Sequence, residues 1–179
     1  MPTYVAFLRA INLGPTRKFP KAEIVAATEA AGGRDVLTHI NTGNVRLTTG
    51  MRSRAKVEAA LERAYLEQTG FEVPTIAYTP AELAAIAADA RELSAARPDR
   101  QRHYVYLLKD EPDAEVVAEV EARSDDLNAV VVRGRAAHIL MGPGYQAGNV
   151  DPFKTERSLG VATNRNFNVV VTLADKWCS

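Results

Sequence analysis

The chain has 179 residues, of which 46% are hydrophobic and 25% are charged, and its 22 basic side chains balance its 22 acidic ones. This composition is typical of a folded globular protein and excludes a disordered, fibrous or coiled-coil chain. Because the net charge is zero, no overall field attracts nucleic acid or anionic lipid, and neither is an expected partner.

The only cysteine, Cys178, rules out an intramolecular disulfide and suits a reducing compartment. No stretch approaches the roughly 18 consecutive apolar residues of a membrane span. The first residues form too short an apolar run for a signal peptide and lack a basic segment before it. We therefore expect a cytoplasmic protein without a membrane segment.

The first half of the chain predicts the order β-α-β-β-α-β. Its opening strand is apolar on both faces, as a central strand covered on both sides would be. Pro20 suits the first turn of a helix, and Ser53 and Gly70 suit the two ends of the next one. The expected elements are a strand at 3–9, a helix at 20–31, strands at 36–40 and 45–49, a helix at 53–70 and a strand at 72–78.

A capping box, Thr79 with Glu82, marks the start of a helix that is expected to run to about Leu93. The following segment, 94–102, has Pro98 and several arginines but no apolar period, which is typical of an exposed linker. This linker predicts two modules, 1–95 and 102–179.

The second half repeats the beginning of the first. It predicts β-α-β-β followed by two helices, with strands at 103–109, 128–133 and 136–141 and helices at 113–123, 151–160 and 166–176. The two halves share little residue identity, so the repeat is one of pattern.

Three polar segments are candidates for a binding site. The loop after the first strand offers Arg9, Asn12 and Lys18, which suit a phosphate or carboxylate. The turn 41–44 offers Asn44 beside a glycine that lets a ligand approach the backbone. The expected start of the last helix offers free N–H groups together with Arg165. A solvated loop, an ordinary turn and a helix cap are the alternative interpretations of these segments.

No catalytic group or metal site emerges from the sequence. The three histidines, His39, His103 and His138, fall in predicted strands, where histidines are usually packing or surface residues. No Cys/His pair has zinc spacing, and no acidic run has the pattern of a calcium loop. The predicted sheet also lacks the aromatic pairs that bind single-stranded RNA. Catalytic residues and cofactors are thus not predicted, and the sequence leaves open whether the protein is an enzyme.

Three segments carry a resemblance to a known family: Tyr4–Gly14, Ile40–Val45 and Ala162–Asn168. In this order along the whole chain they resemble the family called domain of unknown function 1697. The resemblance implies two ferredoxin-like α+β modules packed together, with C-terminal helices, and no agreed substrate. Ala10 and Pro15 depart from the family pattern, in which glycine is typical, and Asn164 stands where threonine is usual.

From these observations the sequence predicts a small anionic ligand bound in a cleft between the two modules, where the three polar segments would converge. The alternative is a module for protein interaction or self-association that has no catalytic activity, because strands apolar on both faces must be covered by something. The sequence is compatible with a monomer or a homodimer.

Overall fold

The computed structural model describes residues 1–146 and 151–178 and divides into two compact units. The first comprises Met1–Leu83 with Trp177–Ser179, and the second comprises Ala84–Lys176. Each contains one four-stranded antiparallel sheet, so the expected α+β class is confirmed. The division falls inside a helix, α3 (Pro80–Ala95), before the linker at which the sequence placed it.

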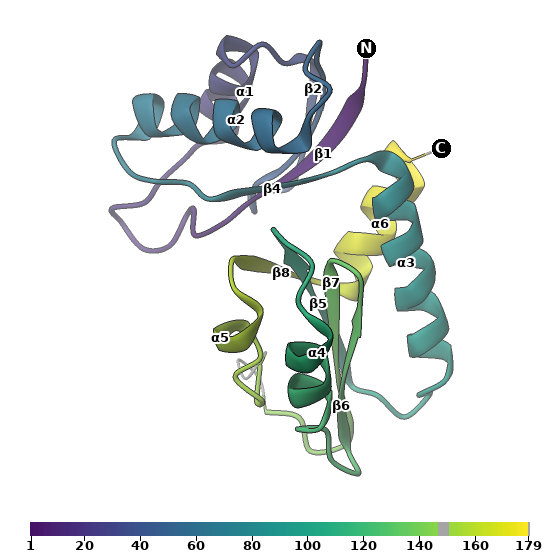
Figure 1. Ribbon diagram of the computed structural model, residues 1–179. Helices are drawn as coiled ribbons and strands as arrows, with labels where there is room; N and C mark the ends of the chain where they lie inside the picture. The colour runs from purple at the N-terminus through teal and green to yellow at the C-terminus, as the bar shows by residue number, and fades with distance from the viewer. Residues whose placement is uncertain (147–150, 179) are drawn as a thin grey trace. The chain divides into compact units, whose positions relative to one another are not determined.

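The first unit follows the predicted order β-α-β-β-α-β (Figure 1). Its sheet has the strand order β2-β3-β1-β4, so the strand that is apolar on both faces is a central one. The elements are β1 (Thr3–Leu8), α1 (Lys21–Ala30), β2 (Arg34–His39), β3 (Asn44–Thr48), α2 (Arg54–Thr69) and β4 (Thr75–Tyr78).

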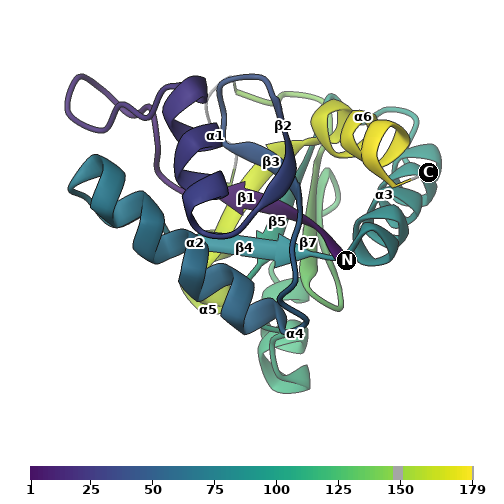
Figure 2. The same ribbon diagram turned by 90° about the horizontal axis from the view of Figure 1, so that it is seen from above.

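Helices α1 and α2 cover one face of this sheet, as Figures 1 and 2 both show. Apolar side chains of both helices meet those of β1 and β3 in a buried core that includes Phe19, Leu47 and Leu61. Tyr65 of α2 lies in this core, where its hydroxyl is hydrogen-bonded to that of Thr28 in α1 at 2.8 Å. Burial raises the pKa of the Tyr65 hydroxyl well above its ordinary value.

The predicted ends of two helices are confirmed. Ser53 caps α2 by accepting a hydrogen bond from the backbone N–H of Lys56, and Gly70 ends that helix with a φ of 76°. Thr79 and Glu82 form the predicted capping box: Glu82 donates its N–H to Thr79 Oγ1 at 3.2 Å, and Thr79 donates its N–H to Glu82 Oε2 at 2.7 Å. Local sequence therefore fixes these two boundaries.

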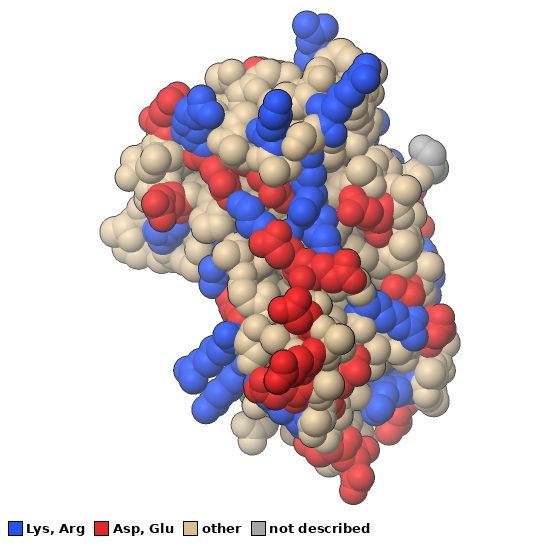
Figure 3. All heavy atoms as spheres, viewed as in Figure 1, with Lys and Arg blue, Asp and Glu red and all other residues tan. Residues whose placement is uncertain are grey.

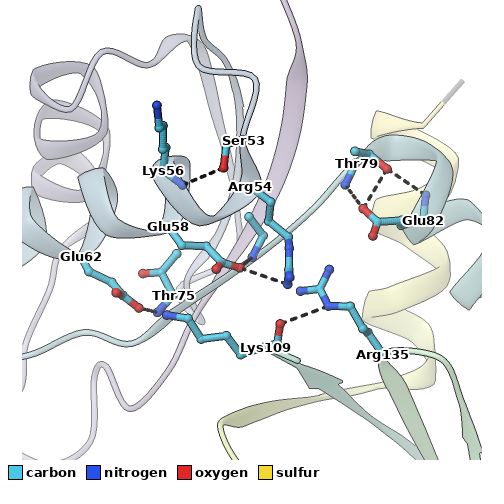
Figure 4. Close-up of polar contacts among 11 residues, drawn as sticks. Ser53, Arg54, Lys56, Glu58, Glu62, Thr75, Thr79, Glu82, Lys109 and Arg135 are labelled. Atoms are coloured by element: carbon cyan, nitrogen blue, oxygen red, sulfur yellow. Dashed lines mark hydrogen bonds and ion pairs between the residues drawn. The ribbon is translucent and has the colours of Figure 1, made fainter. Parts of the chain in front are cut away.

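Strand β4 is an edge strand, and α2 supplies acceptors for its outward N–H groups (Figure 4). The N–H of Thr75 donates to Glu62 Oε1 at 2.9 Å, and that of Ala77 donates to Glu58 Oε1 at 2.9 Å. Glu58 is buried and also lies 3.8 Å from a guanidinium nitrogen of Arg54. Side chains in this position prevent another chain from pairing with the edge.

The second unit contains the rest of α3 and a sheet with the strand order β6-β7-β5-β8. The predicted bounds of β6 and β7 are confirmed. Its further elements are β5 (Arg102–Leu108), α4 (Ala114–Glu121), β6 (Asn128–Arg133), β7 (Ala136–Met141), α5 (Glu156–Leu159), β8 (Ala162–Asn166) and α6 (Phe167–Trp177).

The two faces of this sheet are covered by different helices. Alternate residues of β5 and β7, such as Tyr106 and Ile139, pack in a core with Val120 of α4. The intervening residues, among them His103 and His138, point to the opposite face. Helices α3 and α6 lie side by side on that face (Figures 1 and 2), joined by an ion pair between Arg91 and Asp175 at 2.7 Å.

The prediction of β-α-β-β followed by two helices was wrong for the second unit, because β8 lies between α5 and α6. The segment Ala162–Asn166 is polar and does not alternate, so its sequence carries no strand signal. It becomes a strand by pairing with β5, with Leu108 opposite Ala162 and Tyr104 opposite Asn166. Tertiary pairing thus overrides local propensity here.

In the part of the chain that the structure describes, no helix combines the length and the apolar character that crossing a bilayer requires. On the face drawn in Figure 3, Lys and Arg side chains are interspersed with Asp and Glu side chains. This mixture agrees with the zero net charge.

Candidate functional site

The second unit has a polar pocket of about 610 Å³ at the point where the α3–β5 connection, the beginning of β5 and the beginning of α6 meet. Residues of the second unit alone form its lining. They are Pro98, Arg100, Gln101, Arg102, His103, Tyr104, Asn166, Phe167 and Asn168. This described lining includes two arginines and no Asp or Glu.

Backbone carbonyls hold the two arginines in place. Arg100 donates from Nη1 to the carbonyl oxygens of Ser94 and Arg97, at 2.6 and 3.1 Å, which anchors it to the end of α3. Arg102 donates from Nη1 to the carbonyl of Gln101 at 2.9 Å, and its guanidinium lies 5.4 Å from the ring centre of Tyr145. Among the described residues, neither arginine is within ion-pair distance of a carboxylate. No described carboxylate therefore compensates either positive charge beside the pocket.

The first turn of α6 adds a second positive feature. Asn166 caps the helix by accepting the N–H of Val169 on Oδ1 at 3.0 Å. The N–H groups of the first turn have no carbonyl partner within a helix, and the helix dipole places partial positive charge at this end. Phe167 and Asn168 of this turn line the pocket. The start of α6 and the two arginines together favour the binding of an anion.

His103 is one of the lining residues, and both nitrogens of its imidazole are engaged. Nδ1 is hydrogen-bonded to the hydroxyl of Ser94 at 2.8 Å, and Nε2 to Nδ1 of His138 at 3.0 Å. The ring stacks on Phe167 with the ring centres 5.6 Å apart. His103 therefore presents no free nitrogen to the pocket and is poorly placed to act as a general base.

Burial also keeps the two histidines uncharged. It lowers the pKa of His103 to about 3, with the charges of His138 and Arg100 acting in the same direction. It lowers the pKa of His138 to about 4, where Asp89 opposes the shift and Arg133 adds to it. Both imidazoles are neutral near pH 7.

The sequence-predicted residues of the first loop lie in the first unit, where two of them are tied to neighbouring backbone. Asn12 donates from Nδ2 to the carbonyl of Asn41 at 2.8 Å and accepts the N–H of Phe19 on Oδ1 at 3.0 Å. The backbone N–H of Arg9 donates to the carbonyl of Pro74 at 2.9 Å, and the side chain of Lys18 is exposed. The loop and the turn thus contact each other through Asn12, within the first unit.

The other two predicted residues are also held by their own surroundings. Asn44 is buried and donates from Nδ2 to the carbonyl of His39 at 3.0 Å and to Thr42 Oγ1 at 2.9 Å. Arg165 belongs to β8 in the second unit, where its Nη1 donates to Thr163 Oγ1 and to the carbonyl of Asn164. Burial lowers the pKa of Arg165 to about 10. Ligand contact by these five residues stays a prediction.

The loop after β1 contains a residue with a strained backbone, at one of the positions that depart from the family pattern. Ala10 has a φ of 57°, a value at which glycine is favoured over residues with a side chain. We expect Ala10→Gly to raise the free energy of unfolding by about 0.5–1 kcal/mol, measured by urea denaturation. The matched control is Ala59→Gly on the exposed face of α2. We expect this change to lower the free energy of unfolding by about 1 kcal/mol. Destabilisation by both changes would contradict the strain argument.

Sequence reasoning missed Arg100 and Arg102, because it assigned them to a solvated linker. The usable signal was local: two arginines directly before a strand that begins with His103, in a chain with zero net charge. The start of the last helix was recognised, with Asn166 in its capping segment, but Asn168 was not singled out. Among the described residues, no group of three or more His, Cys, Asp or Glu is placed to hold a metal ion.

Fold and pocket define a two-unit α+β protein with an arginine-lined pocket in its second unit. The chain belongs to the family described as protein of unknown function (DUF1697), whose model matches residues 1–138, and the predicted resemblance is confirmed. It is also similar to the solved structure of a conserved bacterial protein from Streptococcus pneumoniae, with 19% identity, a TM-score of 0.70, and coverage of 98% of this chain and 99% of that chain. This likeness concerns the fold alone. No curated protein matches the chain.

Proposed function

We propose that the protein binds a small anionic ligand, bearing a phosphate or carboxylate group, in the pocket of its second unit. The observation that carries the proposal is the pair of guanidinium groups, Arg100 and Arg102, that lie beside the start of α6 with no carboxylate of the described residues within ion-pair distance. Guanidinium groups and helix N–H groups are the preferred partners of phosphate and carboxylate oxygens. The pocket volume of about 610 Å³ falls in the range of small-molecule sites.

Binding is a better description of this pocket than acid–base catalysis. Its one imidazole has both nitrogens in hydrogen bonds, and its described lining contains no carboxylate or thiol that could take a proton. The ligand would accordingly be held and oriented by cations and amides. The anionic class predicted from sequence is retained in this proposal, with different residues from those first singled out.

We also infer that the two units are ferredoxin-like modules and that the protein is cytoplasmic. The order β-α-β-β-α-β with β1 and β5 in central positions, found in both units, supports two ferredoxin-like modules. The single cysteine supports a reducing compartment such as the cytoplasm.

Replacing Arg102 with alanine tests the function. We expect about 10- to 100-fold weaker binding of the anions that bind the wild type, because one charge-assisted hydrogen bond is lost. Calorimetric titration with sulfate, phosphate and citrate measures this affinity. Arg102 is preferred to Arg100, whose side chain also holds the end of α3.

The matched control is Arg157→Ala, which removes the same charge from an exposed position in α5 of the same unit. This variant should bind like the wild type. Equal weakening in the two variants would show that only the net charge matters, and the pocket would then be the wrong site. An absence of binding by the wild type to every anion would also overturn the proposal.

A further inference from the structure

The pair His103 and His138 lies behind the pocket and forms a short buried chain of hydrogen bonds. The chain runs from Ser94 Oγ to His103 Nδ1 at 2.8 Å and from His103 Nε2 to His138 Nδ1 at 3.0 Å. His103 is 4% exposed and His138 is fully buried. At its far end, Nε2 of His138 has no hydrogen-bond partner among the described residues.

This geometry selects one arrangement of the protons. If Nε2 of His138 carried a hydrogen, a buried donor would be left unsatisfied, which costs about 1–3 kcal/mol. A bare Nε2 leaves an unpaired acceptor instead, which costs less than an unpaired donor. His138 then donates from Nδ1 to His103 Nε2, and His103 donates from Nδ1 to Ser94. The chain is therefore stable while both rings are neutral, and a further proton has to go to His138 Nε2.

Several charged groups surround the pair, and they do not compensate such a proton. Asp89 of α3 is the acidic group that acts on His138, but its carboxylate is already bound by Arg133 of β6 at 2.7 Å. Arg133 itself acts against a charge on His138. On the pocket side, Arg100 acts against a charge on His103. Uptake of a proton consequently requires that water reach the rings.

Two elements that form the pocket contact His103 directly. Ser94 belongs to the last turns of α3, just before the segment with Arg100. Phe167, stacked on His103, is the first residue of α6. Separation of either contact would open a path for water to His103.

We propose that the His103–His138 pair is an acid-sensitive support of the pocket, which holds the α3–β5 connection and the first turn of α6 in place while neutral and releases them when protonated. The inference rests on the proposed function for its biological meaning, because release of these elements would release the anion. The support itself is a property of the second unit.

The direction of the pH effect follows from the two protonation states. Both histidines have a folded-state pKa, about 3 and about 4, below their ordinary value of 6.5. In the closed state the pair is buried, and in the opened state the α3–β5 connection or the first turn of α6 has separated from it. The opened state therefore binds more protons than the closed state once the pH falls below 6.5. The closed state is fully stable above that pH and loses stability as the pH falls. Opening should become about tenfold more frequent per pH unit for each histidine that is exposed.

Amide hydrogen exchange of the intact protein, corrected for the intrinsic pH dependence, tests this between about pH 6.5 and 5, above the ordinary carboxylate range. In the wild type, opening measured at residues 96–102 and 166–170 should rise by up to about 100-fold per pH unit. His138→Leu should reduce this to about tenfold, because one histidine remains. Amides of α2, in the first unit, provide the internal control and should not show this rise.

Imidazole NMR signals offer a second measurement that needs no variant in the core. The chain has three histidines, so His39→Gln identifies the third signal and leaves the pair. The pair should stay neutral above about pH 5. Titration of either buried ring near its ordinary value, or a pH response unchanged in His138→Leu, would overturn the inference.

Sulfate keeps its charge over this range and separates the two proposals. Saturating sulfate should slow opening at residues 96–102 and 166–170, because a ligand of the closed state stabilises it. If sulfate, phosphate and citrate all fail to bind but the pH response follows the prediction, the proposed function fails and the acid-sensitive support stands. If sulfate binds and the pH response is absent, the support fails and the anion pocket stands.

Discussion

Gly43→Ala is expected to lower the free energy of unfolding by about 2–4 kcal/mol, because it adds both a clash and backbone strain. Gly43 has a φ of 73°, which disfavours residues with a side chain. A Cβ atom there would lie 2.6 Å from Cβ of Leu8 and 2.9 Å from Cδ1 of Ile11. Leu8 belongs to the central strand β1 and cannot give way easily, since its N–H donates to the carbonyl of Gly43 at 2.8 Å.

Gly70→Ala is the matched control for this prediction. Gly70 has nearly the same φ, 76°, but apart from its neighbours in the chain no atom of the described residues lies within 4 Å of the added Cβ. We therefore expect a loss of about 1 kcal/mol, from strain alone. Urea denaturation of both variants gives the difference, which measures the contact between the turn and β1. Equal losses would contradict the close packing.

The packing of Gly43 explains why sequence reasoning found this turn and interpreted it as a ligand site. A glycine between Asn and Thr residues suggests a close approach of something to the backbone. In the structure the groups that approach Gly43 are Leu8 and Ile11 of the same chain. The side chain of Asn44 donates its hydrogen bonds within the turn, to His39 and Thr42. Sequence alone cannot distinguish a ligand from a neighbouring strand, because both require the same missing side chain.

Local sequence signals predicted most of the elements of the first unit. Proline, serine and glycine at helix ends, together with the apolar opening strand, predicted its order of elements, and the capping box at Thr79 was correct at the level of single hydrogen bonds. Such features act over a few residues, so they are visible in sequence. The strand β8 forms by pairing with β5, in which Leu108 lies opposite Ala162, a residue roughly 50 positions later in the chain. No local sequence feature predicts such a strand.

The candidate pocket shows the same limit. Arg100 and Arg102 lie in a polar segment that resembles any solvated linker until α6 is brought beside it. The histidine pair was equally hidden, since His103 and His138 are separated by a helix and a strand and become neighbours only through the register of β5 and β7. Residues that act as a group through tertiary pairing leave little trace in a single sequence.

The acceptors that α2 provides for the edge strand β4 lead to the second large effect. Glu58→Ala is expected to lower the free energy of unfolding by about 2–3 kcal/mol, because the N–H of Ala77 loses its buried acceptor and Arg54 loses a nearby carboxylate. Glu58 itself is 3% exposed, so water does not readily replace it. Urea denaturation measures the loss.

Two further variants isolate the cause. Glu58→Gln keeps an oxygen that can accept the N–H of Ala77 and loses only the charge, so we expect a loss of about 1 kcal/mol. Glu67→Ala removes a carboxylate from an exposed position of the same helix and should change stability by less than about 0.5 kcal/mol. If Glu58→Gln were as destabilising as Glu58→Ala, the charge near Arg54 would be the main contribution, and the protection of the β4 edge by a neutral acceptor would be the wrong explanation.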